Sequence, residues 1–204
     1  MLNDFESKAY LLVPARYAEG SAPLIFLVTG PPGVGKSTVV SRVILRLKSA
    51  GVIIGGCTTQ ERRSKGARTG FAITDLTDGR TGVLATVASR LGPKVGRYKV
   101  NLTDLAGVGA ASVEKAAKSS EVVVIDEVGP MELVSPEFRR AVRNAIGSGK
   151  PLVVVAHERL DDDLLNDLRR DAAETFEVSL ENREESADSL AELVLRAAGG
   201  TKLT

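Results

Sequence analysis

The stretch Leu24-Ile25-Phe26-Leu27-Val28-Thr29, then Gly30-Pro31-Pro32-Gly33-Val34-Gly35-Lys36-Ser37, then residues 38–48, decides the fold of this chain. Residues 24–29 carry almost no polar side chain, which is typical of a strand buried on both faces in a parallel sheet. Residues 30–37 match the pattern G-x-x-x-x-G-K-[S/T] at every fixed position. Apolar residues then recur at helical spacing as far as Leu47, so the stretch predicts a strand, a tight loop and a helix in succession.

The loop between this strand and this helix has the composition of a phosphate-binding loop. Its glycines allow the backbone to curl so that several N–H groups point inward, and the helix N-terminus adds a partial positive charge. Lys36 can then reach the β- and γ-phosphates of a nucleotide, and the Ser37 hydroxyl can bind Mg²⁺. A chance glycine- and proline-rich turn is the competing interpretation, but strand and helix stand on the correct sides of it. The predicted nucleotide-binding residues are Gly30, Pro31, Pro32, Gly33, Val34, Gly35, Lys36, Ser37 and Thr38.

The composition limits the range of functions. The chain has 204 residues, with 27 Lys and Arg against 26 Asp and Glu. This balance creates no overall field toward nucleic acids or acidic membranes, and an aromatic content of 4% supplies few base-stacking platforms. No apolar run approaches the roughly 18 residues of a membrane span, and Cys57 is the only cysteine. We therefore expect a cytoplasmic protein without a membrane or nucleic-acid partner, built as one domain (residues 23–204) behind an N-terminal extension (residues 1–22) to which the sequence assigns no role.

Strand and helix signals alternate along the rest of the chain. Further strands are predicted at residues 52–54, 71–76, 82–88, 98–102, 122–125, 152–156 and 176–180. Helices are predicted at residues 103–118, with an interruption near Gly107 and Gly109, and at 136–146, 161–170 and 183–198. Asp78-Gly79 predicts a β-hairpin, whereas residues 55–70 have the composition of a polar, glycine-bearing loop. These elements predict an α/β fold with three layers, a mostly parallel central sheet and a β-hairpin insertion.

Two acids end the apolar strand at residues 122–125. Asp126 and Glu127 would lie at the carboxyl edge of a parallel sheet, which is also where the phosphate loop lies. Asp126 suits the role of holding Mg²⁺ together with Ser37, and Glu127 is placed to orient and deprotonate an attacking water. The alternative is a solvated strand end before the turn at Gly129-Pro130. A carboxylate poised for water favours hydrolysis over transfer to a second substrate.

Two basic runs and the single histidine give weaker signals. One run has four cations within seven residues, next to Glu61: Arg62, Arg63, Lys65 and Arg68. One of its arginines could act on the γ-phosphate, or the run could hold a phosphorylated acceptor, or it could be a solvated basic loop. The other run is more typical of a solvated face: Arg90, Lys94, Arg97 and Lys99. His157 directly follows the strand at 152–156, where it could sense the γ-phosphate or serve as a hydrogen-bonded loop residue.

Several segments, in chain order, resemble the THEP-type nucleoside triphosphatases, small P-loop enzymes also described as cancer-related nucleoside triphosphatases. The matching segments are residues 30–38, 56–71, 95–102, 124–133 (Val-Ile-Asp-Glu-Val-Gly-Pro-Met-Glu-Leu) and 181–183 (Glu-Asn-Arg). The family pattern usually has Glu-Val-Arg and then two glycines, whereas here Arg62 replaces the valine and Lys65 the first glycine. The resemblance implies a RecA-like P-loop core and slow, Mg²⁺-dependent hydrolysis of several nucleoside triphosphates with little base preference.

Together these patterns predict a Mg²⁺-dependent enzyme that hydrolyses ATP, GTP, CTP and UTP. Lys36 and the loop amides would stabilise the transferred phosphoryl group, while Glu127 would activate water. Secondary candidates are Arg63, Arg68, Gly129, His157 and Arg183. Two other functions stay open: a nucleotide or nucleoside kinase whose acceptor binds residues 61–68, and a nucleotide-dependent switch whose hydrolysis is a timer. No segment indicates a protein partner.

Overall fold

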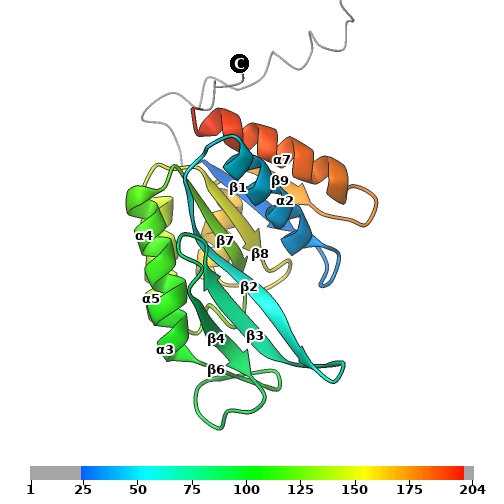
Figure 1. The fold of residues 1–204 in the computed structure, drawn as a ribbon, viewed down its shortest axis with the longest axis vertical. Helices are drawn as coiled ribbons and strands as arrows, with labels where there is room; N and C mark the ends of the chain where they lie inside the picture. Colours follow the sequence, from blue (N-terminus) through cyan, green and yellow to red (C-terminus); the bar gives the residue numbers. More distant parts are fainter. Residues whose placement is uncertain (1–23, 200–204) are drawn as a thin grey trace, which may run out of the picture.

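The computed structural model describes residues 24–199, so the predicted extension at residues 1–22 lies outside the described residues. The described chain forms a nine-stranded sheet of order β5-β6-β4-β3-β2-β7-β8-β1-β9 (Figure 1). The strands are β1 (Ile25–Thr29), β2 (Ile54–Ser64), β3 (Ala67–Asp75), β4 (Thr81–Thr86), β5 (Lys94–Val95), β6 (Tyr98–Val100), β7 (Val122–Val128), β8 (Leu152–Ala156) and β9 (Ala172–Glu177). The helices are α2 (Lys36–Ser49), α3 (Leu102–Asp104), the π-helical turn η2 (Leu105–Ala110), α4 (Ala111–Ser119), α5 (Pro136–Ile146), α6 (Asp163–Arg170) and α7 (Arg183–Ala197).

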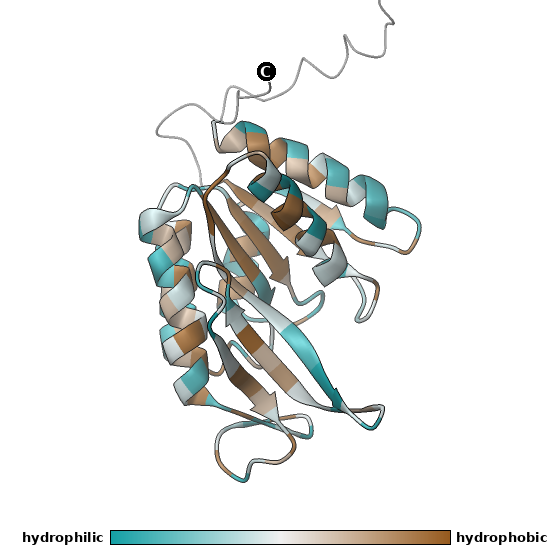
Figure 2. Ribbon diagram, in the orientation of Figure 1, coloured by the Kyte–Doolittle hydropathy of each residue, from teal (hydrophilic) through white to brown (hydrophobic). Residues whose placement is uncertain are grey.

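The half of the sheet that carries the phosphate loop is parallel. β1 pairs with β8 and β9, and β7 pairs with β8 and β2, in each case in parallel. Helices α2 and α7 cover one face, and α4, α5 and α6 cover the other (Figure 1). The central strands β7 and β8 are therefore buried on both faces and are the most hydrophobic part of the molecule in Figure 2. The predicted three-layer α/β arrangement is confirmed for this half.

The other half of the sheet is antiparallel, so the prediction of a mostly parallel sheet is wrong. β3 pairs with β2 and β4, and β6 pairs with β4 and β5, all antiparallel. The predicted hairpin around Asp78-Gly79 is confirmed between β3 and β4. It is one turn of a larger antiparallel extension rather than a small insertion. The sheet is mixed because the chain between β2 and α3 returns through short turns, which join only antiparallel strands.

The prediction of a polar loop at residues 55–70 is also wrong, because most of that segment is a hairpin. β2 extends to Ser64, and β3 begins at Ala67. The turn between them is made by Lys65 and Gly66, whose φ angles are 48° and 79°. A two-residue hairpin turn commonly requires positive φ at both positions. The strand signal was hidden because the outer part of β2 is largely exposed and carries polar and charged side chains on both faces.

Three smaller predictions concern the last strand, the helical region after β6 and the start of α5. The last strand is Ala172–Glu177 rather than residues 176–180, and the chain leaves it at Val178, whose N–H donates to the Thr29 carbonyl at 2.9 Å. The helical region after β6 is not broken at Gly109 but passes through η2, where a Cβ on Gly109 would lie 2.6 Å from Ile73 Cδ1. The predicted N-cap of α5 is confirmed, since Ser135 accepts from Phe138 N–H at 3.1 Å. Among residues 24–199, no helix is long and apolar enough to span a membrane.

Candidate nucleotide-binding site

The phosphate loop joins the end of β1 to the start of α2, at the carboxyl edge of the parallel half. Gly30, Gly33 and Gly35 have φ angles of 137°, 78° and 111°, a region that favours glycine. A Cβ on Gly30 would lie only 2.6 Å from the Val178 carbonyl oxygen. Within the described part of the chain, no side chain caps the N-terminus of α2. The first N–H groups of α2 therefore point toward the loop without a side-chain partner, as an anion-binding helix terminus requires.

Lys36 and Ser37 are the first two residues of α2. The Lys36 ammonium donates to the carbonyl oxygens of Gly30 and Pro31 at 2.8 and 3.0 Å, so its charge lies within the loop. The Ser37 hydroxyl donates to Asp126 Oδ1 at 3.3 Å. This contact joins the phosphate loop to the end of β7, two strands away in the sheet. The structure thus brings the predicted loop and the predicted acids to one place.

A cavity of about 690 Å³ opens at this edge of the sheet. Three segments form its wall: the phosphate loop, one face of the β2–β3 hairpin, and the residues at the ends of β7 and β8. The lining residues are Gly30, Pro31, Pro32, Gly33, Gly35, Lys36, Ser37, Thr38, Thr59, Glu61, Arg68, Phe71, Glu127, His157, Glu158 and Arg159. Of the nine residues predicted in the loop, only Val34 is not part of this wall; it packs on the core instead. The sequence did not single out Thr59, Glu61, Phe71, Glu158 or Arg159 as site residues. For Thr59 and Glu61 the reason is the loop prediction for 55–70, which concealed that both face inward.

Asp126 lies behind Ser37 rather than on the cavity wall. Its side chain is buried, with a relative exposure of 2%. The pKa of the Asp126 carboxyl is raised to about 7, because burial and the charge of Glu127 outweigh the opposing effects of the hydrogen bond from Ser37 and the charge of Lys36. A buried carboxyl with so high a pKa gains from a cation beside it. A hydroxyl and a carboxylate are both hard oxygen donors, so this pair fits Mg²⁺.

The metal would need ligands beyond these two residues. Among the described residues, no group of three or more His, Cys, Asp or Glu side chains could hold an ion. Mg²⁺ is commonly bound through one or two protein oxygens together with substrate phosphates and water. The donor set of Ser37 and Asp126 therefore matches an ion that arrives with a nucleotide rather than one resident in the protein.

Glu127 lines the cavity and faces the same space as Lys36. Burial raises the pKa of its carboxyl above the ordinary value, while Lys36 and His157 act in the opposite direction. Gly129 lies against it: a Cβ on Gly129 would come within 2.6 Å of Glu127 Oε1. Gly129, a secondary candidate from the sequence, therefore leaves space that the Glu127 carboxylate occupies.

Glu132 is a buried carboxyl behind Glu127 that the sequence did not single out. Its relative exposure is 4%, and its Oε2 accepts from the Gly129 N–H at 3.1 Å. Its pKa is raised to about 8, because burial and the charges of Glu127 and Asp126 outweigh the opposing effect of its backbone hydrogen bonds. A neutral Glu132 beside Glu127 limits the negative charge that gathers at the end of β7. The only available signal was an acid within the segment that follows the two predicted acids.

His157 lies on the cavity wall, directly after β8. Its Nδ1 accepts from the N–H groups of Arg159 and Leu160 at 3.3 and 3.1 Å. In a neutral ring the proton is then on Nε2, which leaves a hydrogen-bond donor for a ligand. The interpretation as a hydrogen-bonded loop residue is confirmed, and a role in sensing the γ-phosphate stays a prediction.

The loop that carries His157 is held by Arg169 of α6. One nitrogen of its guanidinium donates to the carbonyls of His157 and Leu160 at 2.8 and 3.1 Å, and reaches that of Glu158 at 3.4 Å. His157, Glu158 and Arg159 all line the cavity. One side chain outside the cavity therefore supports this entire part of the wall.

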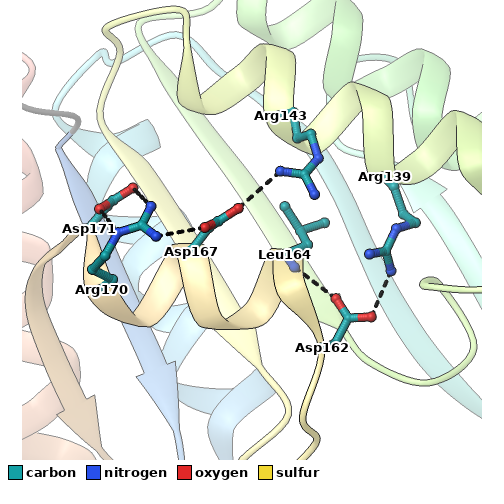
Figure 3. A network of polar contacts seen from close by, with 7 residues as sticks. All are labelled: Arg139, Arg143, Asp162, Leu164, Asp167, Arg170 and Asp171. Atoms are coloured by element: carbon teal, nitrogen blue, oxygen red, sulfur yellow. Dashed lines mark hydrogen bonds and ion pairs between the residues drawn. The ribbon is translucent and has the colours of Figure 1, made fainter.

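Helix α6 is in turn tied to α5 by a chain of ion pairs (Figure 3). Asp162 caps α6 through the Leu164 N–H at 2.9 Å and pairs with Arg139 at 2.8 Å. Asp167 lies between Arg143 at 3.0 Å and Arg170 at 2.9 Å. Networks of this kind hold orientation better than isolated surface pairs do, so they place α6, and with it Arg169, under the loop.

The arginines predicted as secondary candidates have different positions. Arg68 lines the cavity, forms an ion pair with Glu61 and lies over the ring of Phe71 at 5.8 Å. Arg63 also pairs with Glu61 and donates to the Gly66 carbonyl at 3.1 Å, and it does not line the cavity. Arg183, at the start of α7, lies beside the phosphate loop, since a Cβ on Gly35 would come within 3.5 Å of its Cδ. The geometry thus favours Arg68 and Arg183 over Arg63.

Replacing Arg169 tests the support of the His157 loop. Arg169→Gln is expected to lower the turnover number about tenfold or more, because small misplacements in a catalytic wall have large effects on rate. Arg196→Gln, which makes the same change at an exposed arginine in the last turn of α7, serves as the matched control and should leave turnover unchanged. If Arg169 acts through the histidine, adding Arg169→Gln to His157→Ala should lower turnover little further. Full additivity of the two losses in steady-state assays would contradict this.

Comparison with known proteins gives a consistent result along the sequence. A family model described as NTPase matches residues 25–191. The nucleoside-triphosphatase THEP1 of Thermofilum pendens is 43% identical over 177 residues, which cover 84% of this chain and 97% of the relative. The protein of the same name from Methanosarcina acetivorans is 43% identical over 173 residues, with 84% and 97% covered.

Solved structures are similar over almost their full length. The crystal structure of THEP1 from the hyperthermophile Aquifex aeolicus superimposes with a TM-score of 0.74 at 29% identity, covering 84% of this chain and 99% of that one. The solution structure of a human cancer-related nucleoside triphosphatase gives a TM-score of 0.71 at 33% identity, with 86% and 98% covered. The likeness thus includes both the parallel half and the antiparallel extension of the sheet.

Proposed function

The chain belongs to the NTPase family, as a nucleoside-triphosphatase, and on that premise we propose that it cleaves ATP, GTP, CTP and UTP slowly, in the presence of Mg²⁺, to the diphosphate and phosphate. One observation carries the proposal: Glu127 lines the same cavity as Lys36 and the phosphate loop. A partly buried carboxylate with a raised pKa, facing a phosphate-binding loop, suits the activation of water. The relatives' names support the same reaction.

The phosphate loop binds and orients the triphosphate. Its N–H groups and the N-terminus of α2 contact phosphate oxygens, and Lys36 donates to the oxygens on which charge accumulates as the terminal bond breaks. When bound, Mg²⁺ would neutralise charge on the same oxygens, with Ser37 and Asp126 as the residues that hold it. His157, on the cavity wall, would donate a hydrogen bond from its Nε2–H to the terminal phosphate.

Glu127 receives the proton of the attacking water. The water adds to the terminal phosphorus, the bond to the bridging oxygen breaks, and the nucleoside diphosphate leaves with that oxygen. A raised pKa makes Glu127 a stronger base than an ordinary carboxylate, as long as it is ionised at the working pH. Gly129 allows its carboxylate to lie toward the cavity, and neutral Glu132 behind it would avoid a second negative charge.

Broad base specificity is supported by the kind of group in the cavity. The residues that line it beyond the phosphate loop are charged or small, apart from Phe71 and His157. Base selection generally needs fixed donors and acceptors that match one base edge. The charged residues are instead occupied with one another, as in the pair of Arg68 with Glu61. We therefore expect the four nucleotides to differ little.

Release of phosphate from ATP, GTP, CTP and UTP, measured side by side with and without Mg²⁺, tests the proposal. All four should be hydrolysed at rates within about tenfold of one another, a discrimination below about 1.4 kcal/mol in activation free energy. Chelation of Mg²⁺ should abolish the release. Including nucleosides and nucleoside monophosphates as acceptors tests the kinase alternative: a labelled acceptor in place of free phosphate would overturn hydrolysis as the main reaction.

A further inference from the structure

The antiparallel half of the sheet has one face that no helix covers. In Figure 1 no helix is drawn in front of β2, β3 and β4, and the buried apolar residues of these strands pack with those of α4 and η2 on the other face. Apolar residues of this half, such as Ile73, Leu84 and Val100, belong to the core cluster on the α4 side. Among the buried residues described for the chain, none from β3, β4, β5 or β6 belongs to the cluster on the α2 side. We call this uncovered side of β2–β6 the open face.

Strand register places three cations in one row across the open face. Arg62 of β2 is paired with Gly70, Gly70 with Thr86, Thr86 with Lys99, and Lys99 with Lys94. Directly paired residues of antiparallel strands share a face. Lys99 alternates with the buried Tyr98 and Val100, so the row faces away from the core. Arg62 and Lys94 are exposed and Lys99 is partly exposed.

The open face and its border are basic without nearby acids. The other polar residues on it are neutral, such as Thr58, Gln60 and Thr74. The acids of these strands, Glu61 and Asp75, fall on the opposite face, with the buried residues Cys57 and Ile73. Two more exposed cations border the row, in the β2–β3 turn and in the loop between β4 and β5. The basic face thus comprises Arg62, Lys65, Arg90, Lys94 and Lys99.

Tertiary contacts join two basic runs that are separate in the sequence. Arg97 of the second run donates to the carbonyl of Arg68 in the first at 2.6 Å. Val87 N–H donates to the Thr69 carbonyl at 3.0 Å, which closes the β4 end against the start of β3. Among the ion pairs of residues 24–199, none involves a member of the basic face. The chain therefore has a locally positive surface although its total numbers of cations and acids are nearly equal.

From this arrangement we propose that the basic face binds a double-stranded nucleic acid through its phosphate backbone. A row of long cationic side chains on an otherwise neutral sheet face is complementary to a phosphate backbone. The aromatic rings of this half, Phe71 and Tyr98, lie on the other face and pack edge to face with their ring centroids 5.2 Å apart. A single strand bound by stacking its bases needs exposed aromatic side chains, and the open face has none among the described residues. Contacts to phosphates alone suit a duplex, whose bases are turned inward.

Fluorescence anisotropy with a short, mixed-sequence DNA duplex and its RNA counterpart tests the proposal. Five phosphate contacts predict a slope of log affinity against log salt of about −4.5, and a loss of about 500-fold between about 50 and 200 mM salt. The triple variant Arg62→Glu, Lys94→Glu, Lys99→Glu should weaken binding at least tenfold and flatten the slope to about −1.8. None of the three residues lines the nucleotide cavity, so nucleotide hydrolysis without nucleic acid should be unchanged.

The control is a triple variant with the same change in net charge elsewhere. Lys48→Glu, Lys118→Glu and Arg196→Glu replace exposed cations in the last turns of α2, α4 and α7. Equal loss of affinity in both triple variants would overturn the proposal, because it would indicate attraction by total charge. So would failure of the wild type to bind the duplex at about 50 mM salt, tighter binding of the separated strand, or equal binding to anionic lipid vesicles. The assay needs no hydrolysis, so its result is independent of the proposed enzyme function.

Discussion

Glu127→Gln is expected to lower the turnover number by about 10²- to 10⁴-fold while nucleotide affinity stays close to that of the wild type. The amide has nearly the shape of the carboxylate but cannot accept the proton of the attacking water. Glu127 lines the cavity with Lys36, yet no contact in the structure requires its charge to hold the phosphate loop. The loss should therefore appear in turnover alone, in steady-state phosphate release combined with titration of a fluorescent nucleotide.

A matched control for Glu127 is available on the same cavity wall. Glu158→Gln makes the identical chemical change at another carboxylate that lines the cavity. Because Glu158 follows β8 and is partly paired with Arg159, we expect its loss to change turnover by less than about tenfold. If Glu127→Gln hydrolyses ATP at the wild-type rate, another group accepts the proton and the assignment of the base is wrong.

Lys36→Ala is expected to weaken both nucleotide binding and turnover, the latter by about 10²- to 10³-fold. The Lys36 ammonium lies within the phosphate loop, where it donates to two of the loop's carbonyls. Its charge would contact phosphate oxygens before and during bond cleavage, so part of its contribution is to binding and part to rate. Removing it also leaves the loop carbonyls of Gly30 and Pro31 without their donor. Binding of a non-hydrolysable analogue and single-turnover rates separate the two losses.

The variant Lys48→Ala on the same helix is the control for Lys36. Lys48 is exposed in the last turn of α2, far along the helix from the loop. Its replacement should leave both measurements unchanged and alter thermal stability by no more than a few tenths of a kcal/mol. A Lys36→Ala protein that binds normally and loses only turnover would mean that the lysine acts in the transition state alone. One that loses neither would remove the phosphate loop from the proposal.

Local patterns in the sequence were sufficient to predict the phosphate loop and the acids at the end of β7. Strand, loop and helix follow one another within residues 24–49, so their geometry depends on near neighbours and on glycine φ angles. The helix at residues 136–146 and the hairpin around Asp78-Gly79 also depend on short segments, and both are confirmed. Where one apolar run or one turn decides an element, composition and spacing are enough.

Local sequence patterns could not predict how segments distant in the chain pair with one another. The exposed outer part of β2 has no apolar alternation, so its hairpin with β3 was predicted as a loop, and with it the sheet as mostly parallel. The wall residues Thr59, Glu61 and Phe71, and the buried Glu132, become recognisable only when register decides which side chains face the cavity or the core. Arg169 has no motif at all, because its role consists of contacts to carbonyls twelve, eleven and nine residues away.

The sequence by itself determined that this chain has a phosphate loop followed by helix α2 and an acid pair after a buried strand, because each is encoded within a few consecutive residues. Only the tertiary structure decided that Glu127 and Lys36 share one cavity and that Arg62, Lys94 and Lys99 share one row. The physical reason is that strand register and helix packing are set by the burial of many apolar side chains at once. That burial also sets the positions of the polar residues, so the local sequence around a polar residue contains little information about where it lies in the fold.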